Sequence, residues 1–195
     1  MTHIYFVRHA KPQFNFEINR KRPLSEEGKA DCKKVCECLK DTKLDFAVSS
    51  PFIRSVDTIR ECAQMHGLPI VLNEDFRERE SGKLAPDVYF ASIRDRWADF
   101  DYCEEGGESL RQVQERNIRS LKRLLSEHEG ESILFGTHGT ALSTILNYYD
   151  NSFGYDDFMA IVDMMPYIIR LDFDGTTLIG KEELLMVYKE YKPQA

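Results

Sequence analysis

Cationic and imidazole side chains follow two of the apolar stretches in this sequence. Arg8 and His9 come directly after the first stretch, and His138 follows another one, within the run Gly-Thr-His-Gly-Thr. Arg54 lies one helical turn beyond the end of a third stretch. Guanidinium groups, imidazole N–H groups and the free backbone N–H groups of a helix start all bind tetrahedral oxyanions. Their combination favours a phosphate group as the ligand.

A carboxylate that could move a proton lies in the charged run at residues 77–80. Glu78 and Glu80 point to the same side if this run is extended, because side chains alternate along a strand. Arg79 lies between them, and two interpretations of it stay open: contact with a second anionic group of a substrate, or exposure to solvent. Each of these residues also fits an ordinary solvated surface, so their meaning depends on where the fold places them.

The elements that must position these residues are short apolar runs alternating with amphipathic stretches. The sequence predicts strands at residues 3–7, 46–49, 69–72 and 133–135, and a hairpin over residues 168–179 that turns at Asp174-Gly175. It predicts helices from Ser25 to about Lys40, from Ser50 as N-cap and Pro51 as first residue to Gly67, from Ser109 over four turns, and over residues 141–149.

This alternation predicts an α/β fold, a three-layer α/β/α sandwich with a mainly parallel, mixed sheet to which the hairpin adds antiparallel strands. In such folds ligands bind beyond the carboxyl ends of the strands. The candidate side chains all follow strand ends, so we expect them to meet at one edge of the sheet. Residues 83–108 are less regular, and we expect them to cover the substrate.

Composition limits the classes of protein that this chain can represent. It has 195 residues, 42% of them hydrophobic and 30% charged, which predicts one globular domain over residues 1–195. The net charge of −7, with no dense basic run, argues against nucleic-acid binding. Neither a leader nor a membrane-length apolar run is recognisable, so no membrane association is expected.

The five cysteines do not have the spacing of a disulfide framework. A metal site is one interpretation of Cys32, Cys36 and Cys38. The better one is a helix stripe, because Cys32 and Cys36 share helical spacing with Val35 and Leu39. Free thiols predict a reducing compartment, and we expect a cytoplasmic protein with no metal.

Five short motifs follow one another along the chain: Arg8-His9, Ser50-Pro51-x-x-Arg54, Glu78-x-x-x-Gly82, Gly107-Glu108-Ser109 and Thr137-His138-Gly139. In order and context they resemble the histidine phosphatase superfamily, in its phosphoglycerate mutase-like branch, over about residues 4 to 145. The family usually has glycine where this chain has Ala10, although some members have alanine, and the added methyl group raises the question whether it crowds the loop.

The resemblance implies a role for each matched residue. His9 resembles the nucleophile that becomes a phosphohistidine, and Arg8, Arg54 and His138 resemble the clamp on the phosphoryl oxygens. Glu78 resembles the general acid and base, with Glu80 as its competitor. The further contacts expected with the substrate come from Asn15, Arg79, Gly139 and Thr140. The resemblance requires neither a metal nor another cofactor.

The resemblance favours a phosphatase over a mutase, because mutases of this branch carry a longer basic insertion than residues 83–108. We expect a small phosphorylated metabolite as substrate, and a phosphohistidine or phosphoprotein as the second choice. Mutase-type phosphoryl transfer and a catalytically weak, phosphate-binding interaction module stay open as alternatives. The sequence assigns no function to residues 150–195 and no oligomeric state.

Overall fold

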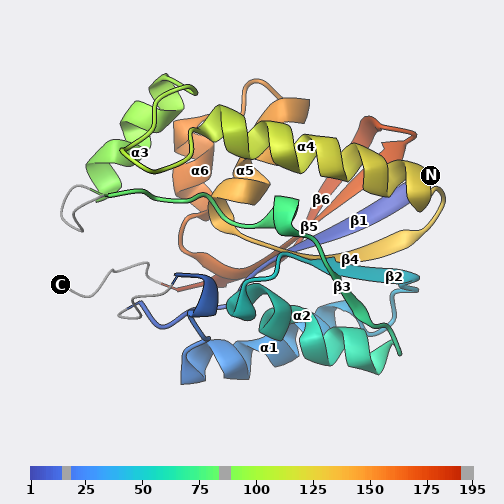
Figure 1. Ribbon diagram of the computed structural model, residues 1–195. Helices are drawn as coiled ribbons and strands as arrows, with labels where there is room; N and C mark the ends of the chain where they lie inside the picture. Colours follow the sequence, from blue (N-terminus) through green and yellow to red (C-terminus); the bar gives the residue numbers. More distant parts are fainter. Residues whose placement is uncertain (15–18, 84–88, 190–195) are drawn as a thin grey trace.

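The computed structural model describes residues 1–14, 19–83 and 89–189 (Figure 1). Its centre is a six-stranded sheet in the order β3-β2-β4-β1-β5-β6. The strands are β1 (Thr2–Arg8), β2 (Phe46–Ser49), β3 (Ile70–Leu72), β4 (Ser132–Thr137), β5 (Met164–Asp174) and β6 (Thr177–Tyr188). The first four run parallel, and β5 and β6 are antiparallel additions, which confirms the predicted mixed sheet and hairpin.

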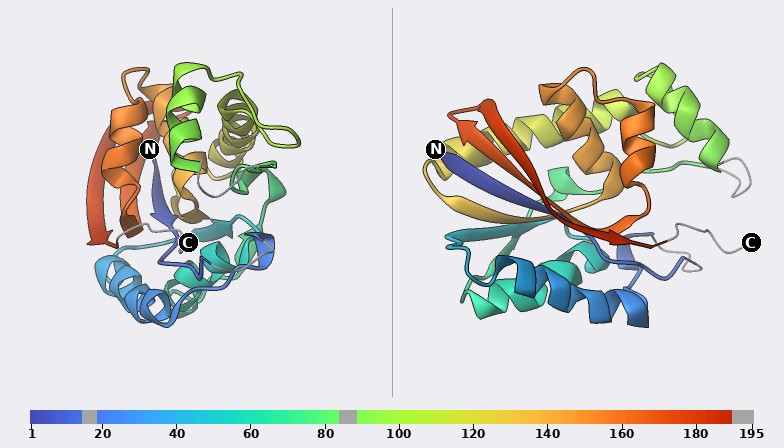
Figure 2. Two further views of the ribbon diagram at one scale, coloured as in Figure 1. Left: turned by 90° about the vertical axis from the view of Figure 1, so that its left-hand side faces the viewer. Right: turned by 180° about the vertical axis from the view of Figure 1, so that it is seen from behind.

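Helices cover both faces of the sheet (Figure 2). One face carries α1 (Glu26–Leu39) and α2 (Ile53–Met65), and the other carries α4 (Leu110–Glu127), α5 (Gly139–Tyr149) and α6 (Tyr155–Ile161). The helix α3 (Tyr89–Ala98) lies beside α6, and the short 3-10 helices η1 (Asn19–Lys21) and η2 (Glu74–Phe76) complete the described elements. The predicted three-layer sandwich is therefore confirmed.

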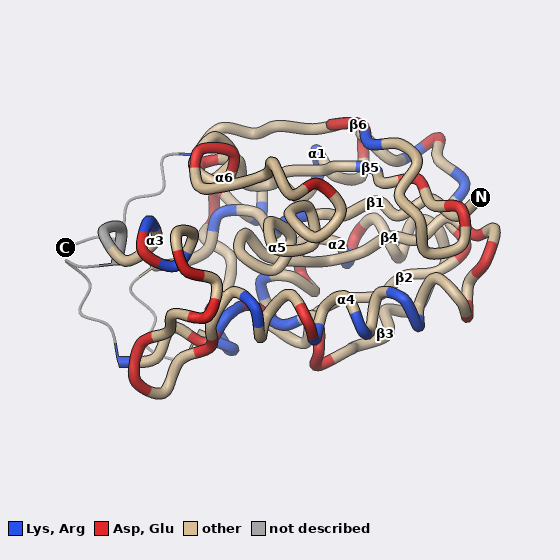
Figure 3. Tube along the Cα trace, turned by 90° about the horizontal axis from the view of Figure 1, so that it is seen from above, with Lys and Arg blue, Asp and Glu red and all other residues tan. Residues whose placement is uncertain are grey.

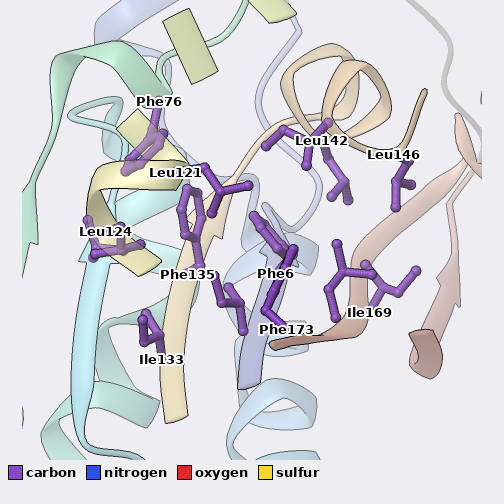
Figure 4. Packing of buried hydrophobic residues seen from close by; sticks show 14 of the residues in the cluster. Phe6, Phe76, Leu121, Leu124, Ile133, Phe135, Leu142, Leu146, Ile169 and Phe173 are labelled. Carbon is purple, nitrogen blue, oxygen red and sulfur yellow. The ribbon is translucent and has the colours of Figure 1, made fainter. Parts of the chain in front are cut away.

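Successive side chains of β1 point to opposite faces of the sheet and contribute to the hydrophobic core on each face. Ile4 and Phe6 face the α4 and α5 side, where Phe6 packs on Phe135 with ring centroids 4.6 Å apart (Figure 4). Tyr5 and Val7 face the α1 and α2 side. A strand buried on both faces reads as a continuous apolar run, which explains the start of this sequence.

The predicted helix starts are confirmed at two positions and wrong at a third. The Ser25 side chain accepts from Gly28 N, and Ser109 forms a capping box with Gln112. The second helix begins at Ile53 instead of Pro51, and its N-cap residue is Phe52. Ser50 does not cap the helix, because its hydroxyl bonds to His138 and accepts from the backbone N–H that follows Pro51.

Cysteines occupy the buried stripe of α1, as predicted: Cys32 and Cys36 lie with Val35 and Leu39 against the core. Helices α3 and α6 were not predicted. Ile93 of α3 packs against Phe158 of α6, so this pair is stabilised by a contact between distant segments. Acidic and basic residues are interspersed along α3 and α4 (Figure 3).

Among residues 1–14, 19–83 and 89–189, no helix is both long and apolar enough to cross a lipid bilayer.

Candidate active site

Three neighbouring strands bring the predicted residues together. In the order β2-β4-β1, the register pairs Ser49 with Gly136 and Arg8 with Thr137, so the strands end at one level. The backbone N–H of His9 donates to the Thr137 carbonyl at 3.1 Å. The carboxyl ends of these strands therefore deliver Arg8, His9 and His138 to one place, as expected for parallel strands.

His9 is buried, with 6% of its surface exposed, and its ring lies edge-on to that of His138 with centroids 5.3 Å apart. Nδ1 lies 2.8 Å from the Ala10 carbonyl oxygen. Because a carbonyl only accepts, Nδ1 carries the proton and Nε2 keeps its lone pair. Burial, together with the positive charges of Arg54 and Arg8, holds the pKa of His9 well below its usual value. The ring is a neutral imidazole with a nucleophilic Nε2.

His138 occupies the N-cap position of α5 and is fully buried. Its Nε2 lies 2.6 Å from the Ser50 hydroxyl oxygen, and its ring makes an edge contact with Phe52 at 5.1 Å. Burial, followed by the charge of Arg54 and the proximity of His9, lowers its pKa well below the usual value. The rings of His9 and His138 are therefore two neighbouring, buried and neutral imidazoles.

The Arg8 guanidinium is fixed by backbone carbonyls at the end of α6. It donates to the carbonyl oxygens of Ile161, Val162 at 2.9 Å and Met164 at 3.1 Å. A Cβ atom at Gly139 would lie 3.3 Å from this guanidinium, so glycine allows the start of α5 to approach it closely. Residues 161, 162 and 164, to which the sequence assigned no function, thus hold Arg8 in the site.

Arg54, which is 3% exposed, lies in the first turn of α2. It donates to the carbonyl oxygen of Asn19 at 2.7 Å, and its guanidinium carbon lies 5.0 Å from the centre of the Phe52 ring. This hydrogen bond and cation–π contact fix the side chain at the site. Its positive charge helps to lower the pKa of both imidazoles.

Glu78 bonds to the first turn of α5, beside His138. Its carboxylate accepts from Thr140 N at 3.0 Å and Ala141 N at 3.1 Å, and from Arg79 N at 2.9 Å. An anion at a helix N-terminus is favoured by the helix dipole and the free N–H groups. Glu80 is exposed and is not among the residues that bond to this helix start. The geometry thus favours Glu78 as the carboxylate of the site.

Arg79 is not exposed to solvent, so that interpretation is wrong. It is 4% exposed, pairs with Glu104 at 2.8 Å, and donates to the carbonyl oxygen of Glu108. Arg96 of α3 pairs with the same Glu104 carboxylate, which ties α3 to the segment that carries Glu78. Contact of Arg79 with substrate stays a prediction, and Asn15 lies outside the described residues.

Ala10 is accommodated without crowding. The residue is fully buried and packs in a small cluster with Leu24 and Cys32. Its N–H donates to the Thr58 hydroxyl at 3.0 Å. Among the residues that the structure describes, no residue other than glycine has a positive φ. The methyl group is therefore part of the core and strains no backbone.

Arg116 of α4 is a residue of the site that sequence reasoning missed. It donates to the carbonyl oxygens of Asp75 at 2.7 Å and Arg77 at 2.8 Å, and to that of Glu78 at 3.3 Å. The Glu108 carboxylate pairs with its other donors at 2.9 Å. Arg116 thus holds the backbone that carries Glu78.

A signal for Arg116 exists in the sequence. The buried stripe of α4 includes Val113, Asn117 and Leu121, and helical spacing puts Arg116 on that stripe, between the first two. A charged residue on a core-facing stripe needs a buried partner, which points to an internal role. Ser50 has no comparable signal, because Ser-Pro also fits an ordinary helix start.

Within residues 1–14, 19–83 and 89–189, no three histidine, cysteine, aspartate or glutamate side chains are grouped so that they could hold a metal ion.

Residues 4–162 match the sequence profile of the histidine phosphatase superfamily (branch 1). A phosphoglycerate mutase-like protein 4 from Arabidopsis thaliana is 30% identical over 159 residues, which cover 73% of this chain and 68% of that relative. An uncharacterized phosphatase, PhoE, from Bacillus subtilis is 27% identical over 150 residues, which cover 75% of this chain and 76% of that protein.

The fold is also similar to that of solved structures. A phosphoserine phosphatase mutant from Entamoeba histolytica, solved with phosphoserine, superposes with a TM-score of 0.76 at 17% identity. The superposition covers 94% of this chain and 97% of that one. At this level of identity the likeness shows the fold, and the matched profile shows the family.

Proposed function

The chain belongs to the histidine phosphatase superfamily, branch 1, and we propose from this that it hydrolyses a phosphate monoester through a phosphohistidine on His9. The observation that carries the proposal is the state of His9. Its proton is held at Nδ1 by the Ala10 carbonyl, and burial with Arg54 and Arg8 lowers its pKa. Nε2 is therefore available as a nucleophile at neutral pH.

In the first step, His9 Nε2 forms a bond to phosphorus while the bond between phosphorus and the leaving oxygen breaks. Arg8 and Arg54 neutralise the charge of the phosphoryl oxygens, and together with His138 they orient these oxygens. Glu78 takes up a proton as the anionic substrate binds beside it, donates that proton to the leaving oxygen, and the alcohol departs. In the second step, Glu78 takes a proton from water, which attacks phosphorus and releases phosphate from His9. Each step conserves charge, and the second restores the neutral imidazole of His9 and the protonated Glu78.

The contacts of the 83–108 segment support a phosphatase over a mutase. A mutase would need basic side chains in this segment to bind a phosphoglycerate. The basic side chains present here contact other residues of the protein instead. Arg96 pairs with buried Glu104, Lys83 with Glu105 at 2.8 Å, and Arg94 lies 4.9 Å from the centre of the Tyr155 ring. We propose that this segment covers the substrate without supplying a second strong anion site.

A small phosphorylated metabolite is the proposed substrate, with a phosphoprotein as the second choice. The phosphoserine bound by the Entamoeba histolytica relative is a molecule of the proposed class. We further propose that residues 1–195 form one domain. The free cysteines, of which Cys32, Cys36 and Cys62 are buried, support a cytoplasmic location.

Hydrolysis of p-nitrophenyl phosphate by the wild-type protein and by His9→Ala tests the proposal. We expect turnover by the wild type, none by the variant, and an acid-labile phosphoryl group on the wild type alone. Turnover should also persist in a chelator, because the proposed chemistry uses only side chains. Saturable phosphate binding without turnover would instead support the interaction module.

A second assay addresses the mutase alternative. The protein is given 3-phosphoglycerate with a bisphosphorylated primer, and isomerised product is measured beside free phosphate. We expect phosphate release without isomerisation. Isomerisation that outpaces phosphate release would contradict the phosphatase proposal while leaving the phosphohistidine intact.

A further inference from the structure

The Ser50 hydroxyl lies between two nitrogen atoms. Its oxygen is 2.6 Å from Nε2 of His138 and 3.2 Å from the backbone N of Phe52. Ser50 has no exposed surface. The Phe52 N–H can only donate, so the Ser50 oxygen accepts there. The direction of the bond to His138 is the question that remains.

Two arrangements of this bond are possible. If Nε2 carried the proton, Ser50 would accept twice and its own buried O–H would need a further acceptor. Among the described residues Ser50 Oγ has these two partners, so that arrangement leaves two buried polar groups unmatched, the Ser50 O–H and the Nδ1 lone pair of His138. With the proton on Nδ1, only the Nδ1–H is unmatched. Ser50 therefore donates its proton to Nε2, and His138 carries its own proton on Nδ1.

Nδ1 of His138 is the second observation. It is a buried atom, in a residue with no exposed surface, and it has no hydrogen-bond partner among the described residues. A buried N–H that the protein leaves unmatched beside a nucleophile suits a ligand oxygen as its acceptor. The ring lies edge-on to His9, with centroids 5.3 Å apart.

We propose that Ser50 is a positioning residue that fixes His138 as the Nδ1–H tautomer, so that a neutral imidazole donates to a phosphoryl oxygen. This inference rests on the proposed function. It makes the two histidines complementary. His9 has its proton on Nδ1, bonded to the Ala10 carbonyl, and offers a lone pair from Nε2. His138 offers an N–H from Nδ1, and a carbonyl and a hydroxyl set these opposite roles.

The proposal also explains why a neutral His138 can serve as part of the clamp. With Nε2 accepting from Ser50, the ring donates from Nδ1 without becoming charged, next to the buried charge of Arg54. Loss of the Ser50 hydroxyl removes the group that selects the tautomer. The Nε2–H form would then turn a lone pair toward the phosphoryl oxygen and repel it.

NMR of the full chain labelled with 15N-histidine tests the tautomer directly. The His138 signals are assigned by their loss in His138→Gln. We expect the protonated nitrogen to be Nδ1 in the wild type, and the Nε2–H form or a mixture in Ser50→Ala. Protonation at Nε2 in the wild type would overturn the proposal. This readout needs no turnover, so it stays informative if the phosphatase proposal fails.

Kinetics provide the second readout. In Ser50→Ala we expect kcat/KM for p-nitrophenyl phosphate to fall about 10- to 100-fold and vanadate inhibition to weaken by a similar factor, the range for one hydrogen bond to a charged group. Ser49→Ala is the matched control, because Ser49 is equally buried but bonds to Ser55 at 3.0 Å. Ser50→Thr, which keeps a hydroxyl, should recover most of the loss.

Two kinetic outcomes would contradict the inference. An unchanged tautomer and unchanged kinetics in Ser50→Ala would show that the hydroxyl selects nothing. Equal losses in Ser49→Ala and Ser50→Ala would show a general effect of removing a buried hydroxyl at this strand end. If Ser50→Ala does not fold, the wild-type spectrum and Ser50→Thr still decide between the two tautomers.

Discussion

His9 and His138 follow neighbouring parallel strands, whereas Glu78 follows the 3-10 helix η2 outside the sheet. We refer to the first group, with Arg8, as the strand-end half of the site, and to residues 74–82 as the loop half. In the strand-end half, the ladder of backbone bonds between β1 and β4 sets the spacing of the side chains. In the loop half, no strand ladder performs that task.

Side chains hold the loop half instead. Arg116 binds three of its carbonyl oxygens, and Glu108 balances that charge while accepting from Glu80 N at 3.1 Å. A backbone ladder spreads its strength over many bonds, whereas the loop half depends on a few side-chain pairs, Arg116 with Glu108 and Arg79 with Glu104, beside an isolated bridge between Ser81 and Gly107. The difference teaches that a single substitution can displace the proposed acid while the nucleophile stays in place.

The largest expected effect comes from the loop half. Glu78→Gln should slow hydrolysis of alkyl phosphates, whose leaving group is poor, about 10²- to 10⁴-fold, because the proposed general acid is lost. Aryl phosphates with good leaving groups should lose much less. Rates with a series of leaving groups measure this. Glu80→Gln is the matched variant, and equal losses in both variants, or equal losses for all leaving groups, would move the acid elsewhere.

Arg54→Ala tests the phosphate clamp, which the strand-end half shares with the first turn of α2, and a somewhat smaller loss is expected. Removing one buried donor to the phosphoryl oxygens should reduce kcat about 10²- to 10³-fold and weaken vanadate inhibition. The loss should be the same for good and poor leaving groups, which distinguishes it from Glu78→Gln. Arg60→Ala is the control, because Arg60 lies on the same helix and is exposed. Unchanged vanadate inhibition in Arg54→Ala would refute the clamp.

The strand-end half and the loop half also differ in how well the sequence predicts them. The strand-end half was predictable, because apolar runs mark buried strands and parallel strands present their carboxyl ends at one edge. His9 and His138 were placed by that rule alone. Glu78 was singled out by its motif, because nothing in the local sequence predicts that its carboxylate bonds to a helix start 62 residues away.

Three features of the fold escaped prediction for physical reasons. Ser50-Pro51 fits a helix start, but the tertiary bond to His138 overrides that local preference. Helices α3 and α6 are short, and they are stabilised by packing of Ile93 on Phe158, which no local pattern records. Arg8 looks like a free phosphate ligand in the sequence, yet carbonyl groups at the end of α6 hold its guanidinium.

Arg116→Met tests the loop half in a different way. It removes the arginine that holds the backbone of this half and leaves Glu78 itself unchanged. We expect kcat for poor leaving groups to fall about tenfold, as for the loss of one hydrogen bond to a charged group, and the variant to be destabilised by about 3 kcal/mol, because Glu108 loses a buried partner. Leaving-group series and urea unfolding measure the two effects.

Arg116→Lys and Arg123→Met are the comparison variants. A lysine keeps the charge but cannot span several carbonyl groups and a carboxylate at once, so it should restore stability more than the rate with poor leaving groups. Arg123 is exposed on the same helix, and its loss should change neither. A uniform rate loss across leaving groups in Arg116→Met would show that Arg116 supports the whole site, not the loop half.

The smallest expected effect is on the pH dependence of stability. The strand-end half and the loop half should lose their contributions to stability in different pH ranges. Burial lowers the pKa of His9 and of His138 well below 6.5 in the folded state. Below that pH the unfolded chain therefore binds more protons than the folded protein. As the pH falls, the free energy of unfolding should decrease by roughly 1 kcal/mol per pH unit for each of these two imidazoles.

Glu104 and Glu108 affect stability at lower pH. Burial would raise their pKa, but bonds that include Arg79 and Arg116 reverse the shift and lower it from 4.5.

Stability that depends on these two carboxylates is complete above about pH 4.5 and is lost as the pH falls further. Urea unfolding between pH 5 and 6.5 therefore isolates the imidazoles of the strand-end half. The double variant His9→Asn, His138→Gln should flatten the slope in this range, and His66→Gln, which changes a histidine outside the site, should leave it unchanged. An unaltered slope in the double variant would mean that the two rings are not held neutral by the fold, and the nucleophile assigned to His9 would lose its physical basis.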